Sequence, residues 1–133
     1  MIPRIGLAVF LPFLATVIYL ANRGKLPGML SFVDRIPYGD TLGHFFLMGI
    51  FAFLATGVSG GRCFLLMGLR IPIGAGVVFV IVLLEEFSQL FVASRTFSWL
   101  DLAADFLGIL LFGWWASRVY GSWRAESAEE PSG

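Results

Sequence analysis

Long apolar segments separated by short polar stretches are the dominant pattern of this chain. Four such segments can be delimited, at residues 5–21, 40–58, 71–91 and 99–119. Each has close to the ~20 residues that a helix needs to cross the hydrocarbon core of a bilayer. The pattern predicts an all-α fold, a bundle of four transmembrane helices forming one domain over residues 1–133. The acidic residues 124–133 are expected to be a disordered tail.

Prolines and glycines mark the connections between these segments. The longest connection is residues 22–39, and two shorter loops are expected at residues 59–70 and 92–98. Residues 64–69 are apolar, so the third helix could begin early, but Pro72 suits the first turn of a helix. The first segment resembles a signal peptide, yet no convincing cleavage site follows it, so we expect it to be retained.

Composition agrees with a membrane protein. The chain is 58% hydrophobic and 14% charged, whereas soluble domains carry about 25% charged residues. We therefore predict a multi-pass protein of the cell membrane. Its net charge of zero gives no indication of a nucleic-acid partner. One cysteine and one histidine exclude a cysteine-based or multi-histidine metal centre within a single copy, and we expect neither a metal site nor a cofactor.

The basic residues give a weak prediction of orientation. With four helices, five arginines lie on the side of both termini and four basic residues lie on the other side: Arg4, Arg62, Arg70, Arg118 and Arg124 against Arg23, Lys25, Arg35 and Arg95. Because basic residues favour the cytoplasmic side, both termini are predicted to be cytoplasmic.

Polar and charged side chains gather where the second helix begins, the third ends and the fourth begins. These candidate binding residues are Asp40, His44, Glu85, Glu86, Gln89, Arg95, Asp101 and Asp105. An ionisable group inside a membrane costs roughly 2.5–3.5 kcal/mol on insertion scales. Several of these residues are three or four apart, a spacing that places side chains on one helix face. The sequence therefore predicts one shared pocket at one membrane face.

Simpler interpretations compete at several of these positions. Asp40 can act as a helix N-cap, and Ser98 with Asp101 has the spacing of a capping box. His44 can be an interfacial histidine, and Arg95 an ordinary loop charge. Glu85 and Glu86 have no such explanation, and because neighbouring residues diverge by about 100° on a helix, only one of the two is expected to point fully inward.

Glycines inside the segments are predicted to let helices approach closely. They are Gly43, Gly49, Gly57, Gly74, Gly76, Gly108 and Gly113.

The same polar residues carry a family resemblance. The run from Asp40 to Phe45 resembles the D-K-x-x-H-F opening of the VanZ-like membrane proteins. The later positions resemble that family's E-x-x-Q, R-x-F and D-x-x-x-N-x-x-G signature; they are Glu86, Gln89, Arg95, Phe97, Asp101, position 105 and Gly108. The resemblance covers about residues 39–113. Two residues depart from it, because Thr41 stands where the family often has lysine and Asp105 where it usually has asparagine.

The resemblance implies a name and a set of residues rather than a reaction. The family takes its name from a protein associated with low-level resistance to teicoplanin, a glycopeptide that binds cell-wall precursors. It thus implies a bacterial membrane protein of the cell envelope, connected with antibiotic resistance.

The chemistry of the cluster leaves three hypotheses. Its acids outnumber its bases, and like charges in a poorly hydrated site cannot all stay ionised without a proton, a bound cation or a cationic ligand. The first hypothesis is a binding or accessory protein for a lipid-linked envelope precursor or a glycopeptide. The second is a small intramembrane enzyme whose catalytic candidates are His44, Glu86, Arg95 and Asp101. The third is a purely structural polar network. Whether the protein is an enzyme is left open.

Overall fold

The computed structural model describes residues 1–22, 38–91 and 98–129. Four helices and one β-hairpin make up this part of the chain. In chain order they are α1 (Ile2–Asn22), α3 (Gly39–Val58), β1 (Cys63–Leu66), β2 (Leu69–Pro72), α4 (Ile73–Gln89) and α5 (Trp99–Glu129). The predicted all-α class is therefore confirmed in its main feature, since the described residues are mostly helical, but a small β element has to be added.

Three of these helices are long and apolar enough to cross a membrane. The candidate spans are Ile2–Leu20, Gly39–Val58 and Trp99–Gly121. Helix α4 has 17 residues, which corresponds to about 26 Å at 1.5 Å per residue, and is shorter than the ~30 Å hydrocarbon core. Three helices thus support the prediction of a membrane protein. The prediction of four spans requires the shorter helix α4 to cross the membrane as well.

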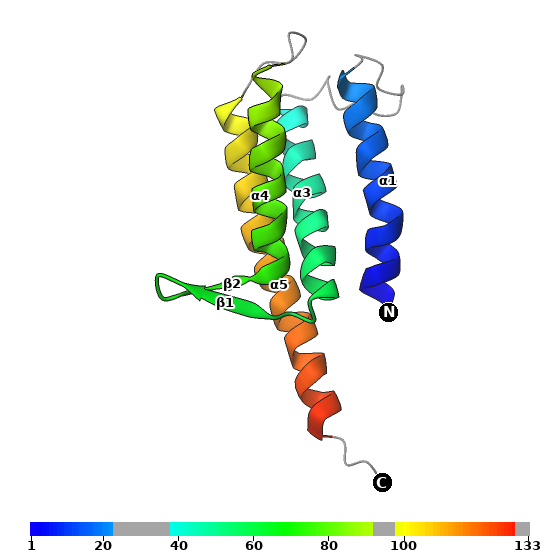
Figure 1. Cartoon of the computed structure of the whole chain (residues 1–133), viewed down its shortest axis with the longest axis vertical. Helices are drawn as coiled ribbons and strands as arrows, with labels where there is room; N and C mark the ends of the chain where they lie inside the picture. Colours follow the sequence, from blue (N-terminus) through cyan, green and yellow to red (C-terminus); the bar gives the residue numbers. More distant parts are fainter. Residues whose placement is uncertain (23–37, 92–97, 130–133) are drawn as a thin grey trace.

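Helix α3 is the centre of the bundle. It packs most extensively against α5 and also against α4 and α1. Figure 1 shows the four helices running roughly side by side, with the start of α3, the end of α4 and the start of α5 at the same end. The hairpin lies at the opposite end of α4. The chain order predicted from the apolar segments therefore places the polar residues of three helices at one end of the bundle.

The connection between α3 and α4 differs from the prediction. Instead of a loop, it forms an antiparallel hairpin in which Leu66 pairs with Leu69. The two turn residues, Met67 and Gly68, have φ values of 50° and 81°, and positive φ at both positions is the pattern of a type I′ turn. Because Ile71 and Pro72 belong to β2, the third helix begins at Ile73 rather than at residue 71.

The fourth helix is longer than predicted. Helix α5 continues to Glu129, so residues 124–129, which were expected to be part of a disordered tail, are helical. Residues 130–133 of that tail lie outside the described residues. The first helix continues through Pro12, where the hydroxyl of Thr16 donates to the Pro12 carbonyl at 2.8 Å.

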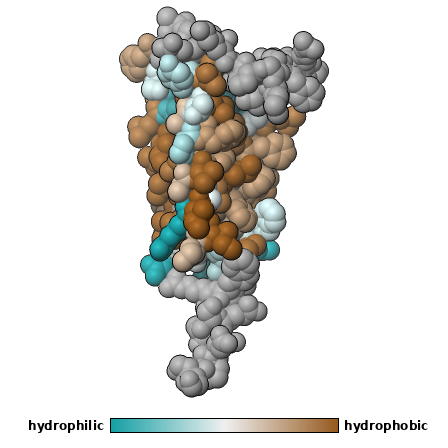
Figure 2. Space-filling model, turned by 90° about the vertical axis from the view of Figure 1, so that its right-hand side faces the viewer, coloured by the Kyte–Doolittle hydropathy of each residue, from teal (hydrophilic) through white to brown (hydrophobic). Residues whose placement is uncertain are grey.

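The bundle has a small core and an apolar outer surface. Its buried apolar residues come from all four helices, with examples in Leu14, Phe51, Val78 and Ile109. Large apolar side chains also cover the outside, and Figure 2 shows them spread over the helical part of one face. Such an exterior is expected where lipid replaces water as the solvent.

Glycine allows the closest helix contacts. A Cβ atom on Gly108 would collide with the carbonyl of Phe45, and one on Gly74 with the backbone of Ala55 and Thr56. Helices α5 and α4 therefore approach α3 backbone to backbone at these positions. No atom of the described residues lies within 4 Å of a Cβ position on Gly43, so the prediction that it packs one of the described helices closely against another is wrong.

Candidate functional site

The close contact at Gly108 determines where the polar residues of α3 and α5 meet. Gly108 touches the backbone of Phe45, and Phe45 directly follows His44. Asp105 lies three residues before Gly108, on the same face of α5. The contact therefore brings the second turn of α3 against the second turn of α5.

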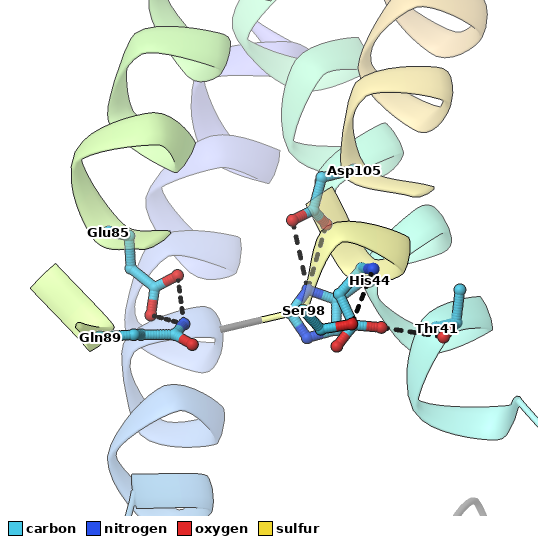
Figure 3. Close-up of polar contacts among 7 residues, drawn as sticks. Thr41, His44, Glu85, Gln89, Ser98 and Asp105 are labelled. Atoms are coloured by element: carbon cyan, nitrogen blue, oxygen red, sulfur yellow. Dashed lines mark hydrogen bonds and ion pairs between the residues drawn. The ribbon is translucent and has the colours of Figure 1, made fainter. Parts of the chain in front are cut away.

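His44 and Asp105 form the centre of the site. The imidazole Nδ1 lies 3.1 Å from Oδ1 and 3.3 Å from Oδ2 of Asp105. The Asp105 side chain is 1% exposed and that of His44 is 18% exposed. Figure 3 shows the two side chains facing one another from neighbouring helices. This is the one ion pair between described residues.

Glu86 completes the buried part of the site from the third helix. It is 2% exposed. One of its carboxylate oxygens, a ring nitrogen of His44 and a carboxylate oxygen of Asp105 all lie within 4.8 Å of one another. Its Oε2 atom is buried and has no hydrogen-bond partner among the described residues. Glu85 is only half-buried, so the expectation that one of the two glutamates points fully inward is confirmed, and the structure identifies it as Glu86.

Asp40 and Asp101 lie on the outer side of His44. Ligand atoms of these three residues also lie within 4.8 Å of one another, with Asp40 exposed and Asp101 half-buried. The hydroxyl of Thr41 donates to Oδ1 of Asp101 at 2.8 Å. His44 therefore stands between two acidic groups, a buried one formed by Glu86 and Asp105 and an accessible one formed by Asp40 and Asp101.

Two capping predictions have different outcomes. The backbone N–H of Asp101 donates to Oγ of Ser98 at 3.3 Å, so Ser98 caps α5 as its spacing indicated. Asp40 does not cap α3, because the helix begins at Gly39 and the cap position is Tyr38, with φ of 59° and no side-chain hydrogen bond. The Asp40 carboxylate instead lies in the first turn, where the positive end of the helix favours it.

Glu85 and Gln89 form a polar pair of their own. The Gln89 amide Nε2 donates to both carboxylate oxygens of Glu85, at 2.8 and 2.9 Å, as side chains four residues apart on one helix can. Figure 3 shows this pair apart from His44 and Asp105. Gln89 is itself buried, and its place in the shared pocket stays a prediction. The predicted site residue Arg95 lies outside the described residues.

The arrangement can act on cations and protons. One imidazole and four carboxylates (Asp40, Glu86, Asp101 and Asp105) offer ligands for a metal ion, or acceptors for a cationic group. The sequence indicated all five of these residues. It did not indicate that the hydroxyl of Thr41 contacts Asp101, because Thr41 was noted only as a departure from the lysine of the family motif.

Comparison with known family models, curated proteins and solved structures gave no match to this chain.

Proposed function

We propose that this chain is a VanZ-like, four-span protein of the bacterial cell membrane. In this proposal it binds a cell-envelope molecule, either a lipid-linked wall precursor or a glycopeptide, at the end of the bundle where α3 and α5 begin. The observation that carries the proposal is the buried Oε2 atom of the Glu86 carboxylate, which has no hydrogen-bond partner among the described residues and lies beside the His44–Asp105 pair. A carboxylate buried without a compensating contact destabilises a protein, so a function is the simplest reason to retain it.

The four-span topology is supported by the course of the chain. Helix α4 starts at the hairpin and ends beside the starts of α3 and α5 (Figure 1). It therefore covers about the same height as α1 and α3, two of the helices that are long enough to span. Seventeen residues are at the lower end of the range for transmembrane helices, and a locally thinned bilayer accommodates such a helix.

The placement of the site favours a ligand that reaches the protein at the membrane surface. Its α3 and α5 residues lie within the first two turns of those helices. Their solvent exposure ranges from the exposed Asp40 to the buried Asp105. A molecule anchored in the bilayer by a lipid and carrying a polar head group fits this depth. The family resemblance adds a connection with a glycopeptide that binds cell-wall precursors.

Binding can be measured with the full chain in lipid nanodiscs and a fluorescent lipid-linked wall precursor. We expect saturable binding that Glu86→Gln weakens at least tenfold, while Glu85→Gln changes it little because Glu85 bonds to Gln89. The same measurement with teicoplanin tests the glycopeptide. Absence of binding to both probes would contradict the proposal.

An intramembrane enzyme is the second candidate. The contact between His44 and Asp105 is the observation that favours it, because a carboxylate that orients an imidazole is a common arrangement in acid–base catalysis. Glu86 would serve as the second acid–base group. A turnover assay with the same lipid-linked precursor decides between the candidates: product formation lost in His44→Gln supports the enzyme, and binding without product supports the binding protein.

A further inference from the structure

We propose that His44, Glu86 and Asp105 bind a divalent metal ion, with Zn²⁺ the ion best suited to them. Each residue comes from a different helix, namely α3, α4 and α5. One imidazole with two carboxylates is a ligand set that zinc accepts, and sites with three protein ligands keep a fourth position open. The ion would thus hold three helices together and still be able to bind another molecule.

The distances suit a shared ion. Zinc–ligand bonds of 2.0–2.2 Å at a tetrahedral centre place ligand atoms about 3.4 Å apart. Nδ1 of His44 and Oδ1 of Asp105 are 3.1 Å apart, and all three ligand atoms lie within 4.8 Å of one another. No hydrogen bond to a described residue holds Oε2 of Glu86 away from such an ion.

The unpaired state of Glu86 is the independent sign of a ligand. Glu85, next to it, is only half-buried and receives two hydrogen bonds from Gln89. Glu86 is buried more deeply, and the described residues give its Oε2 no donor. Carboxylates ligate a metal in their deprotonated form, and one divalent ion would neutralise the two negative charges that Glu86 and Asp105 then carry.

The accessible acids provide a path for the ion. Asp40, Asp101 and His44 form a second group with ligand atoms within 4.8 Å of one another, and Asp40 is exposed. A cation attracted by Asp40 and Asp101 can reach the imidazole first and the buried carboxylates next. The outer acids are therefore expected to affect how fast the ion binds more than how tightly it is held.

The role of this ion, though not its binding, rests on the proposed function. A lipid-linked wall precursor carries phosphate, and an acidic pocket repels an anion. A zinc ion at the centre of the pocket reverses the local charge and offers its open position to a phosphate oxygen. Precursor binding would then depend on the metal.

The direct test is calorimetric titration of Zn²⁺ into the full chain, purified in detergent through a tag without histidine and treated with a chelator. We expect one ion per chain. Glu86→Gln and Asp105→Asn should each weaken the affinity by more than the 10–100-fold that loss of even an outer-shell partner costs. Glu85→Gln is the matched control and should keep the affinity. No saturable binding up to roughly 1 mM, where an interaction is worth about 4 kcal/mol, would overturn the proposal.

A spectroscopic measurement does not depend on whether the variants fold. With Mn²⁺ in place of zinc, pulsed electron paramagnetic resonance detects nitrogen nuclei bound to the metal. Because the chain has one histidine, an imidazole nitrogen signal identifies His44 as the ligand. Bound manganese without such a signal would contradict the site.

Failure of the metal site and failure of the proposed function give different results. Precursor binding that is lost in chelator and restored by zinc supports both. Zinc binding that is weakened by Glu86→Gln and by Asp105→Asn, without any precursor binding, supports the metal site alone. Precursor binding that is unaffected by chelator and lost in Glu86→Gln retains the proposed function and overturns the role of the ion in it, whereas the metal site itself is overturned when calorimetry shows no saturable zinc binding.

Discussion

The imidazole Nδ1 of His44 lies 3.1 Å from Oδ1 of Asp105, across the interface between α3 and α5. The two residues are 61 positions apart in the chain, and both lie in the second turn of their helices. Their contact follows from the glycine approach one turn further on, where Gly108 meets the backbone of Phe45. The close packing of α3 against α5 therefore also positions the His44–Asp105 contact.

Asp105 can be tested with a pair of substitutions. Asp105→Asn keeps an oxygen that accepts from the His44 N–H, so we expect a change of less than about 1 kcal/mol in the free energy of unfolding. Asp105→Leu removes the acceptor and leaves the half-buried imidazole without this partner, which should cost about 1–3 kcal/mol. Unfolding in detergent, followed by circular dichroism, measures both. Equal loss in the two variants would show that the hydrogen bond does not stabilise the α3–α5 interface.

The glycine contact gives a prediction with its own control. Gly108→Ala places a methyl group against the Phe45 carbonyl, which cannot move without shifting the α3 backbone, and should destabilise by about 1–3 kcal/mol. Gly43→Ala on α3 meets no neighbouring element and should be neutral or slightly stabilising, because alanine favours the helix. The melting temperatures of the two variants should differ accordingly. A neutral Gly108→Ala would contradict the close approach of the helices.

Much of the site could be predicted from the sequence because helix spacing and membrane depth are strong constraints. The apolar segments determined which helix ends meet, and the three- and four-residue spacing brought His44, Glu86, Asp101 and Asp105 to one region. The partner of Gln89 could not be predicted, because its spacing to Glu85 and to Glu86 is equally compatible with a helix face. In the structure its amide donates to Glu85.

The hairpin was missed because its signal is short. Residues 64–69 are apolar throughout and so lack the alternation that identifies a half-buried strand. The Met67–Gly68 turn has glycine only at its second position, and asparagine or glycine is usual at the first. The two strands pair with each other and are mostly exposed, so no buried face leaves an alternating pattern in the sequence.

The hairpin turn carries a strained residue that can be relieved. Met67 has φ of 50° and is 96% exposed, and a non-glycine residue in this region costs of order 1–3 kcal/mol. Met67→Gly should therefore stabilise the turn, because glycine adopts positive φ readily. Hydrogen exchange of the Leu66 and Leu69 amides should slow in the variant. Faster exchange would mean that the exposed methionine side chain stabilises the hairpin through contacts of its own, for instance with lipid.

Topology provides the last prediction and tests whether α4 crosses the membrane. We expect a reporter fused after Arg70, in the hairpin, to be cytoplasmic, and one fused after Arg95 to be external. Arg70 precedes α4 and Arg95 follows it, and the α4 helix between them runs from one end of the bundle to the other (Figure 1). The bias of arginines toward the side of the termini sets the direction. A fusion after Val58, where α3 ends, is the control and should agree with the fusion after Arg70.

If the fusions after Arg70 and Arg95 report the same side, α4 does not span, because an odd number of crossings must separate two opposite sides. If they report opposite sides in the reverse sense, four spans remain and the pocket of His44 and Glu86 faces the cytoplasm, which would restrict its ligands to molecules present at the inner membrane face.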